Sequence, residues 1–179
     1  MRLAIFLLSL WSLPATAADI SICYNYGCAV KAEITISNKQ QVQIGQLFAN
    51  VPDAQSERTA IALAIGLFET FAGEQTPTFR DKGGNENDDG VDGRMDCIDH
   101  STNTTAYLHF LADRGLLRFH RVRNPVKRAP MLVNVHWAAL IEEIDNMHDF
   151  VVDSWFFDNG HPAAIFDLND WLRGDSPNV

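Results

Sequence analysis

The chain has 179 residues and a formal net charge of −9 at neutral pH, and 46% of its residues are hydrophobic. This length and hydrophobic content predict one compact domain, and they exclude a largely disordered chain. The acidic balance argues against non-specific nucleic-acid binding, because the phosphate backbone would repel the protein.

The first residues predict an export signal. Arg2 precedes the apolar run 3–13, and Ala15-Thr16-Ala17 forms a small-residue cleavage motif. We therefore expect a signal peptide over residues 1–17 and a mature domain over residues 18–179, with a net charge of −10. An apolar run of only eleven residues is too short to span a bilayer. The sequence thus favours a periplasmic or secreted protein with no stable membrane insertion.

The three cysteines divide into a close pair and an odd thiol. Cys23 and Cys28 enclose four residues, which predicts a local disulfide in an oxidising compartment. A metal site is the alternative for this pair, but no second Cys or His pair follows at a suitable spacing. Cys97 remains, and an unpaired cysteine in an exported protein is expected to be either used or buried.

The order of the predicted elements indicates an α+β domain. Apolar periodicity and turn residues predict strand 32–37, helix 42–50, helix 55–72, an irregular stretch 77–96, helix 98–113, strands 116–122, 131–141 and 150–157, and a short element 163–172. Gly73 and Gly115 are expected to end two of the helices. A loop is predicted from Asn124 to Pro130. Trp171 and Leu172 are expected to cover the core.

One segment runs against the acidic composition. Six of the fourteen Lys and Arg residues fall within fifteen positions: Arg114, Arg118, Arg121, Arg123, Lys127 and Arg128. One interpretation is a docking surface for an acidic partner. The simpler interpretation is a solvated surface that balances the charge of an acidic protein.

Cys97 has the surroundings of a candidate nucleophile. It lies where a helix is expected to begin, and the unpaired N–H groups there favour a thiolate. A catalytic thiol also needs a base. His136 is the best candidate, because a predicted strand would hold it rigidly. His100 competes, but it lies only three residues along the same helix as Cys97.

Asp153 is the candidate partner of His136. A hairpin turn centred on residues 144–145 places position 153 directly opposite position 136. Such residues share a face of the sheet, with Cβ atoms about 5 Å apart. A carboxylate there would accept the imidazole N–H and fix its tautomer.

Three short motifs carry a family resemblance: Asp96-Cys97-Ile98-Asp99, Val135-His136-Trp137 and Val152-Asp153-Ser154-Trp155. In order and spacing, residues 55–160 resemble the transglutaminase-like superfamily, and within it the bacterial transglutaminase-like cysteine proteinases. The resemblance implies a papain-like fold, with helices packed on a small antiparallel sheet, and a triad of Cys97, His136 and Asp153. It also implies a protein or peptide substrate. Ile98 departs from the family, which carries an acidic residue there near its metal.

The acidic loop before Cys97 is a candidate calcium site. Residues 85–96 offer oxygen side chains at positions 1, 3, 5 and 12 of a calcium-loop pattern, with Gly90 at position 6. These residues are Asn85, Asn87, Asp89 and Asp96. A solvated acidic loop is the alternative. Bound calcium would be linked to the nucleophile through Asp96.

Several functional alternatives remain open. Water as the acyl acceptor would give a peptidase or amidase, and an amine would give a transglutaminase. The Cys97 N–H is one expected oxyanion donor, and no second donor is identified. A non-catalytic binding module on the same fold is another alternative. A zinc site of Asp96, Cys97 and His100 lacks a clear fourth ligand. The glycosylation sequon at Asn103 falls within a predicted helix and is attributed to chance.

Overall fold

The computed structural model describes residues 16–129 and 135–177 of the chain. Residues 1–15 of the predicted signal peptide and residues 131–134 of a predicted strand lie outside this part. The first strand, β1 (Ala18–Tyr24), begins directly after the expected cleavage position. Within the described ranges, no helix combines the length and the apolar character needed to cross a membrane.

The described residues form four α-helices and one 3₁₀ helix, and a side-chain cap starts each of them. They are α1 (Asn38–Leu47), α2 (Ala54–Gly73), η1 (Pro77–Arg80), α3 (Cys97–Asp113) and α4 (Leu168–Leu172). Ser37 and Gln40 cap each other's backbone and start α1 four residues earlier than the apolar pattern predicts. At α3, Asp96 and Asp99 form the equivalent box, so Cys97 is the first helical residue.

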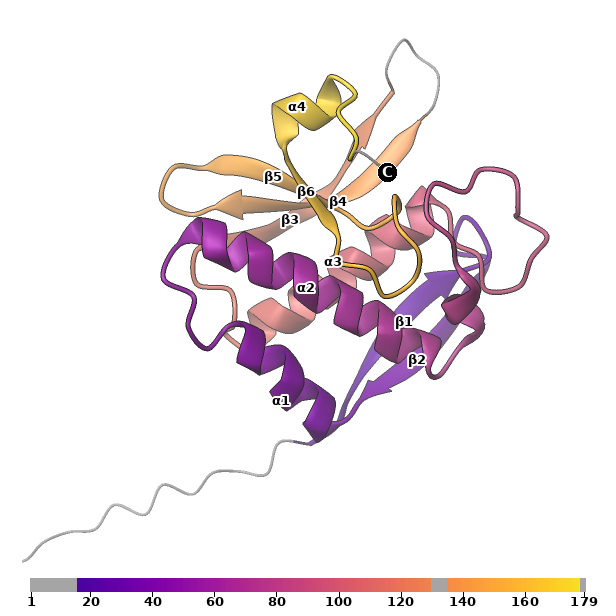
Figure 1. Cartoon of the computed structure of the whole chain (residues 1–179), viewed down its shortest axis with the longest axis horizontal. Coiled ribbons are helices and arrows are strands. Elements are labelled where there is room, and N and C mark those ends of the chain that lie inside the picture. Colours follow the sequence, from indigo (N-terminus) through magenta and orange to yellow (C-terminus); the bar gives the residue numbers. More distant parts are fainter. Residues whose placement is uncertain (1–15, 130–134, 178–179) are drawn as a thin grey trace, which may run out of the picture.

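The strands of the described residues form two antiparallel sheets. β1 pairs with β2 (Val30–Ile36) in a hairpin. A second sheet has the order β3 (His120–Arg128), β4 (His136–Glu143), β5 (His148–Asp153) and β6 (Ala164–Asp167). Figure 1 shows the two sheets in different parts of the molecule, with α2 and α3 crossing between them. This arrangement confirms the α+β class.

Alternation along the strands gives the four-stranded sheet two packed faces. Ala139, Ile141 and Val152 join the main core with α2 and α3, where Phe68 and Tyr107 stack with ring centroids 4.8 Å apart. On the other face, a smaller cluster contains Ala138, Val151 and the fully buried Trp171 of α4. Because side chains alternate with a period of two, His136 and Asp153 belong to the face that carries Trp171.

Several predicted boundaries are wrong for identifiable reasons. The loop predicted from Asn124 is part of β3, because a bulge between Arg123 and Val126 absorbs Asn124 and Pro125 without ending the strand. The strand predicted over residues 150–157 is β5, which ends at Asp153. The sequence does not predict β1. The element expected over 163–172 divides into β6 and α4.

The expected helix-ending glycines and core-covering residues have mixed outcomes. Gly115 has a φ of +66° and follows α3 as expected. Gly73 does not end α2 in this way, because it is still helical and Glu74 caps the helix. Trp171 covers the core as expected, but Leu172 is 42% exposed.

Candidate active site

Cys97 is the first residue of α3, so its thiol lies at the end of the helix where backbone N–H groups have no partner within the helix. Asp96 Oδ1 accepts hydrogen bonds from the N–H groups of Ile98 and Asp99, each at 3.0 Å. Within the described part of the chain, the N–H of Cys97 itself makes no hydrogen bond. This donor is therefore free to bind an oxyanion beside a half-buried thiol.

His136 is the first residue of β4, and it contacts the predicted carboxylate. Its Nε2 lies 2.7 Å from Oδ2 of Asp153, and both side chains are buried. The strand register pairs Ala139 with Val152, so direct opposition of 136 and 153 is wrong by two residues. The shift preserves which face each side chain occupies, so the two residues meet diagonally across the hairpin.

The thiol of Cys97 lies close to the start of β4, which carries His136. Its Sγ lies 3.9 Å from the backbone oxygen of Val135, the residue before His136. Cys97 and His136 both line one pocket of about 490 Å³. The pocket wall also includes Tyr26, Asn85, Glu86, Asp96, Arg128, Val135, Trp155 and Gly174. Its volume is typical of a site that holds a small ligand or a few residues of a peptide.

Aromatic rings and charge fix the state of His136. The rings of Trp155, Phe156 and Trp171 have centroids 4.8, 5.7 and 5.7 Å from its imidazole. This burial opposes the charged form, but the carboxylate of Asp153 and the neighbouring Cys97 favour it more strongly. Together they raise the pKa of His136 to about 9. The imidazole is therefore an imidazolium at neutral pH.

Trp171 is a site residue that the sequence predicts only as core. Its indole N–H donates to Oδ2 of Asp153 at 3.0 Å, the same oxygen that contacts His136. Two donors on one oxygen fix the carboxylate in place, and they keep its charge directed at the imidazole.

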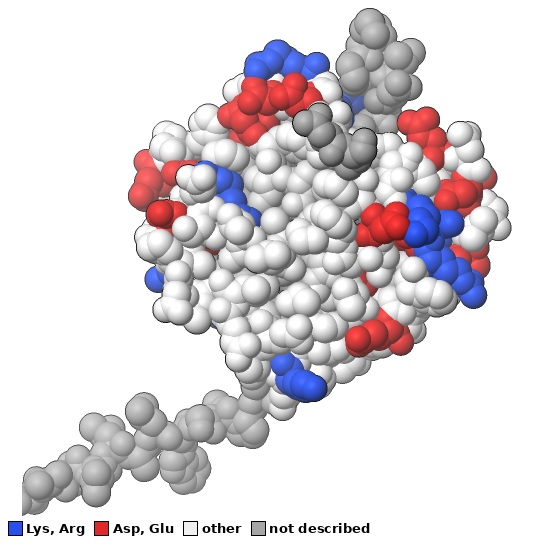
Figure 2. All heavy atoms as spheres, in the orientation of Figure 1, with Lys and Arg blue, Asp and Glu red and all other residues white. Residues whose placement is uncertain are grey.

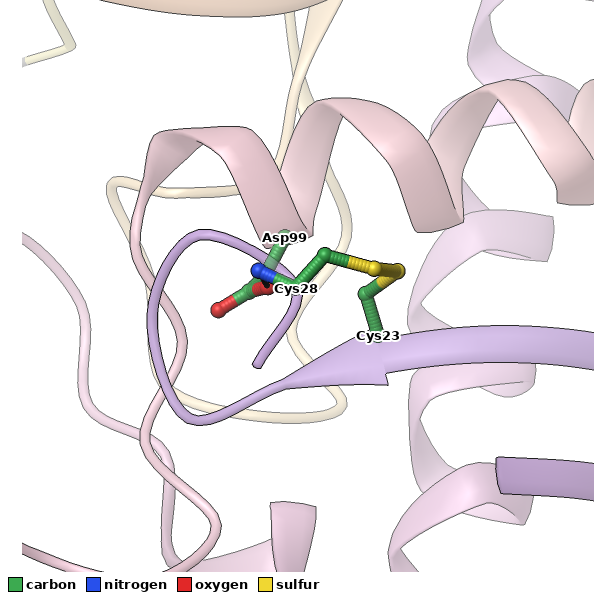
Figure 3. Close-up of side chains that lie close together, drawn as sticks. All are labelled: Cys23, Cys28 and Asp99. Atoms are coloured by element: carbon green, nitrogen blue, oxygen red, sulfur yellow. Dashed lines mark hydrogen bonds between the residues drawn. A yellow bond between two sulfur atoms is a disulfide. The ribbon is translucent and has the colours of Figure 1, made fainter. Parts of the chain in front are cut away.

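A disulfide-closed turn is attached to the helix start that carries Cys97. The predicted Cys23–Cys28 disulfide is present. The four residues 25–28 all have left-handed backbones, with φ between 60° and 67°, which is costly for the three that are not glycine. Asp99 accepts from the N–H groups of Tyr26 and Cys28 at 2.8 and 2.6 Å, as Figure 3 shows for Cys28. Asp96 accepts from the N–H of Gly27 at 3.0 Å.

The carboxyl group of Asp99 has a shifted pKa. Burial and the negative charge of Asp96 raise the pKa of Asp99 to about 6. Its ionised form is retained at neutral pH because three backbone N–H groups donate to it. The carboxylates at the start of α3 therefore stabilise the left-handed turn, and the turn fixes the position of the helix start.

The predicted metal ligands are mostly exposed or already engaged in other contacts. Asn87 and Asp89 are exposed, and Asp96 is occupied as the helix cap. Asn85 donates to Asp88, whose other oxygen is 2.8 Å from the Arg94 guanidinium. The buried side-chain oxygen of Asn85 lacks a hydrogen-bond partner in the described chain, but it would supply only one uncharged ligand atom to a metal.

Arginine thus already supplies positive charge to this loop. Among the described residues, the one group of three His, Cys, Asp or Glu ligands close enough to share an ion is Cys23, Cys28 and Asp99. Its two sulfurs are joined to each other (Figure 3), so they are not thiolate ligands. The donor set does not fit a calcium cage, and we derive no catalytic step through a metal.

His100 has a separate environment and does not face the Cys97 thiol. Its Nε2 lies 2.9 Å from Asp81, and its Nδ1 lies 2.8 Å from the Ser154 hydroxyl and 3.5 Å from Glu69. Burial lowers the pKa of His100, but the two carboxylates outweigh it and raise the value to about 10. With both nitrogens engaged, His100 cannot act as the base for Cys97 or as a zinc ligand.

The basic segment is divided among separate partners. Arg121 and Arg123 both pair with Glu142, and Lys127 lies over the Trp137 ring. Figure 2 shows the charged side chains in small groups around a largely uncharged centre of the visible face. These pairings favour the simpler interpretation of a solvated, charge-balancing surface.

Asn103 is an internal clamp, and its sequon lies within α3. Its side chain accepts from the Cys23 N–H at 2.6 Å and donates to the Cys23 carbonyl at 2.8 Å. The residue is 3% exposed, so it anchors β1 to α3.

Comparisons with protein-family models, with curated proteins and with solved structures found no match to this chain.

Proposed function

We propose that this chain is an exported cysteine peptidase or amidase of the transglutaminase-like type, acting on a protein or peptide substrate. Cys97 is the nucleophile, His136 is first the acid for the leaving amine and then the base for water, and Asp153 is the orienting carboxylate. The observation that carries the proposal is the 2.7 Å contact of His136 with Asp153 on the wall of the pocket that Cys97 enters. A helix start, a strand start and a strand end supply the three groups.

The chemistry follows from the charged state of His136. The Cys97 thiolate attacks a carboxamide carbon, so a C–S bond forms and the carbonyl π electrons move to oxygen. The Cys97 N–H donates to this oxyanion. The C–N bond then breaks, and the His136 imidazolium gives its proton to the leaving amine.

Deacylation reverses the roles. His136, now neutral, takes a proton from water, and the hydroxide attacks the thioester carbon. The C–S bond breaks, which releases a carboxylic acid and restores the thiolate and the imidazolium. An amine in place of water would make the same site a transglutaminase, so the acceptor is an outcome of the assay.

Thiol chemistry tests this proposal without a known substrate. We expect iodoacetamide to label Cys97 rapidly at neutral pH, and His136→Gln to slow the labelling at a temperature where the variant is still folded. Cleavage of a denatured protein mixture, followed by mass spectrometry, should disappear in Cys97→Ala. Ser154→Ala is the matched control, since its hydroxyl faces His100.

Slow labelling that rises only near the pKa of a free thiol, with no cleavage by the native protein, would contradict the proposal. That result would favour a non-catalytic binding module on the same fold.

A further inference from the structure

We infer that Arg128 binds a carboxylate on the leaving-amine half of the substrate. The inference rests on the proposed function and adds a substrate class to it: peptides or amides whose departing amine carries a negative charge nearby. The argument uses the place of Arg128 in the sheet, the way it is held, and the role of its neighbour His136.

Arg128 stands beside the base. It is the last residue of β3, and the strand register pairs it directly with His136 on β4. Directly opposed residues of an antiparallel pair share one face, with Cβ atoms about 5 Å apart. Arg128 also lines the pocket that contains Cys97 and His136. Its guanidinium is therefore directed to the side of the pocket that His136 occupies.

The guanidinium is held in place by one of its nitrogens. Nη1 donates to the backbone oxygens of Trp171 and Asp175 at 2.6 and 2.8 Å. The guanidinium carbon lies 4.5 Å from the centroid of a Trp171 ring. In the part of the chain that is described, Nε and Nη2 make no hydrogen bond. A fixed guanidinium with two free donors is suited to an incoming carboxylate.

Several other arginines of the protein differ in this respect, whereas Arg114 and Arg118 also bond only to amide or carbonyl oxygens in the described chain. Arg58, Arg94 and Arg121 each pair with a carboxylate side chain. Across residues 16–129 and 135–177, no carboxylate side chain lies within ion-pair distance of Arg128. The negative charges of Asp153 and Asp175 act on Arg128 only from beyond that distance, so its guanidinium is open to the carboxylate of a ligand in the pocket.

The reaction itself fixes which half of the substrate meets Arg128. His136 must reach the leaving nitrogen to protonate it, so the groups attached to that nitrogen lie on the His136 side. A carboxylate there has two sources: the α-carboxylate of a C-terminal residue, or the side chain of an acidic residue that follows the scissile bond. Both present the same planar anion to Arg128.

The competing explanation is structural, because Arg128 also holds the segment after α4. The two explanations differ in one measurable way. A clamp affects stability and leaves the reactivity of Cys97 toward charged reagents unchanged, whereas a carboxylate-binding residue favours an anionic reagent over a neutral one of the same size.

Iodoacetate and iodoacetamide make this comparison on the full-length mature protein. We expect Arg128→Gln to reduce the ratio of the iodoacetate rate to the iodoacetamide rate about tenfold, the value of one charge-assisted hydrogen bond. Arg128→Lys should retain part of the preference, and it serves if the Gln variant does not fold. Arg123→Gln is the control, since Arg123 lies on the same strand and pairs with Glu142 outside the pocket.

An unchanged rate ratio in Arg128→Gln, or an equal fall in Arg123→Gln, would overturn the inference. The iodoacetamide rate of the unaltered protein separately tests the proposed function, so the two failures are distinguishable. Peptides cleaved from a mixture then identify the source of the anion. Cleavage lost on C-terminal amidation indicates the α-carboxylate, and cleavage that persists before Asp or Glu indicates a side chain.

Discussion

Two histidine–carboxylate clusters lie close together in this protein, and only one of them opens to solvent. His136 contacts Asp153 beside the pocket with Cys97, and His100 contacts Asp81 beside the sealed hydroxyl of Ser154. The clusters interleave along the chain, because Ser154 follows Asp153 and His100 is three residues after Cys97. A histidine and a carboxylate thus form a candidate active site beside an accessible thiol and a structural contact beside a buried hydroxyl, and access to the pocket makes the difference.

The largest effect should separate the clusters by activity. We expect His136→Gln to lower the rate of peptide cleavage by about 10³-fold or more, because the thiolate loses its partner and the leaving amine its acid. The variant should also lose stability, because the buried carboxylate of Asp153 loses its cation, so the rates are compared at a temperature where both proteins are folded. Comparable inactivation by Ser154→Ala would break the comparison, since it would give the sealed hydroxyl a catalytic role.

The next effect concerns the stability that the His100 cluster provides. His100→Gln leaves the buried carboxylates of Glu69 and Asp81 without a cation, and such a loss typically costs about 3–5 kcal/mol. Urea unfolding measures this change in the free energy of unfolding. His148→Gln is the control, because His148 is an exposed histidine that also pairs with a carboxylate. Equal stability of the two variants would contradict the assignment of His100 as a charged joint.

The pH dependence should also differ between the clusters. The pKa of His100 is raised to about 10 from an ordinary value near 6.5. Its stabilising contribution is therefore complete below pH 6.5 and is lost as pH rises toward 10. Urea unfolding across that range should show the loss, and His100→Gln should lack it.

His136 should show its own pH dependence in reactivity. Since its pKa is about 9, the iodoacetate labelling rate of Cys97 should fall as pH rises through 9. Asp153→Asn removes the carboxylate that favours the imidazolium, so the fall should move to lower pH. A fall at the same pH in this variant would show that Asp153 does not act on His136.

A smaller effect tests the second donor on Asp153. Trp171→Phe keeps a ring in the core and removes the indole N–H that contacts Asp153. We expect a loss of about 1 kcal/mol in stability and a reduction of about tenfold in cleavage rate. Trp137→Phe is the control, because that ring lies under Lys127. If the Trp171→Phe variant reached the unaltered protein's cleavage rate at some other pH, the indole N–H would act only by tuning the charge of Asp153 and His136.

The smallest effect concerns the acidic loop. Because Arg94 already pairs with Asp88 there, we expect calcium and a chelator to give the same melting temperature and the same labelling rate of Cys97. A clear stabilisation by calcium would show that the loop rearranges to bind it.

The sequence predicts the groups of the candidate site better than their exact geometry. Cys97, His136 and Asp153 are found from residue type and spacing, since an alternating strand keeps side chains on one face even when the register is wrong by two. The bulge at Asn124 and Pro125 cannot be predicted this way, because a proline there has the same local signature as a loop.

Other contacts depend on tertiary packing and leave little signal in the sequence. Trp171 and Arg128 meet the site across the sheet, so no local pattern relates them to His136. The Asp96–Asp99 capping box could have been found from its spacing, and it would have placed Cys97 at the first helical position. The charged state of His100 depends on Glu69 and Asp81, which come from two other segments.

The disulfide-closed turn gives the protein opposing requirements for oxidation. Cys97 must stay reduced to act as a nucleophile, while Cys23 and Cys28 must stay oxidised to hold the turn against the start of α3. A reducing agent that restores an oxidised Cys97 will, at higher concentration, open the disulfide beneath it. Reductant titrations of the proposed activity should therefore pass through a maximum, and a buffer rich in thiols would hide that activity.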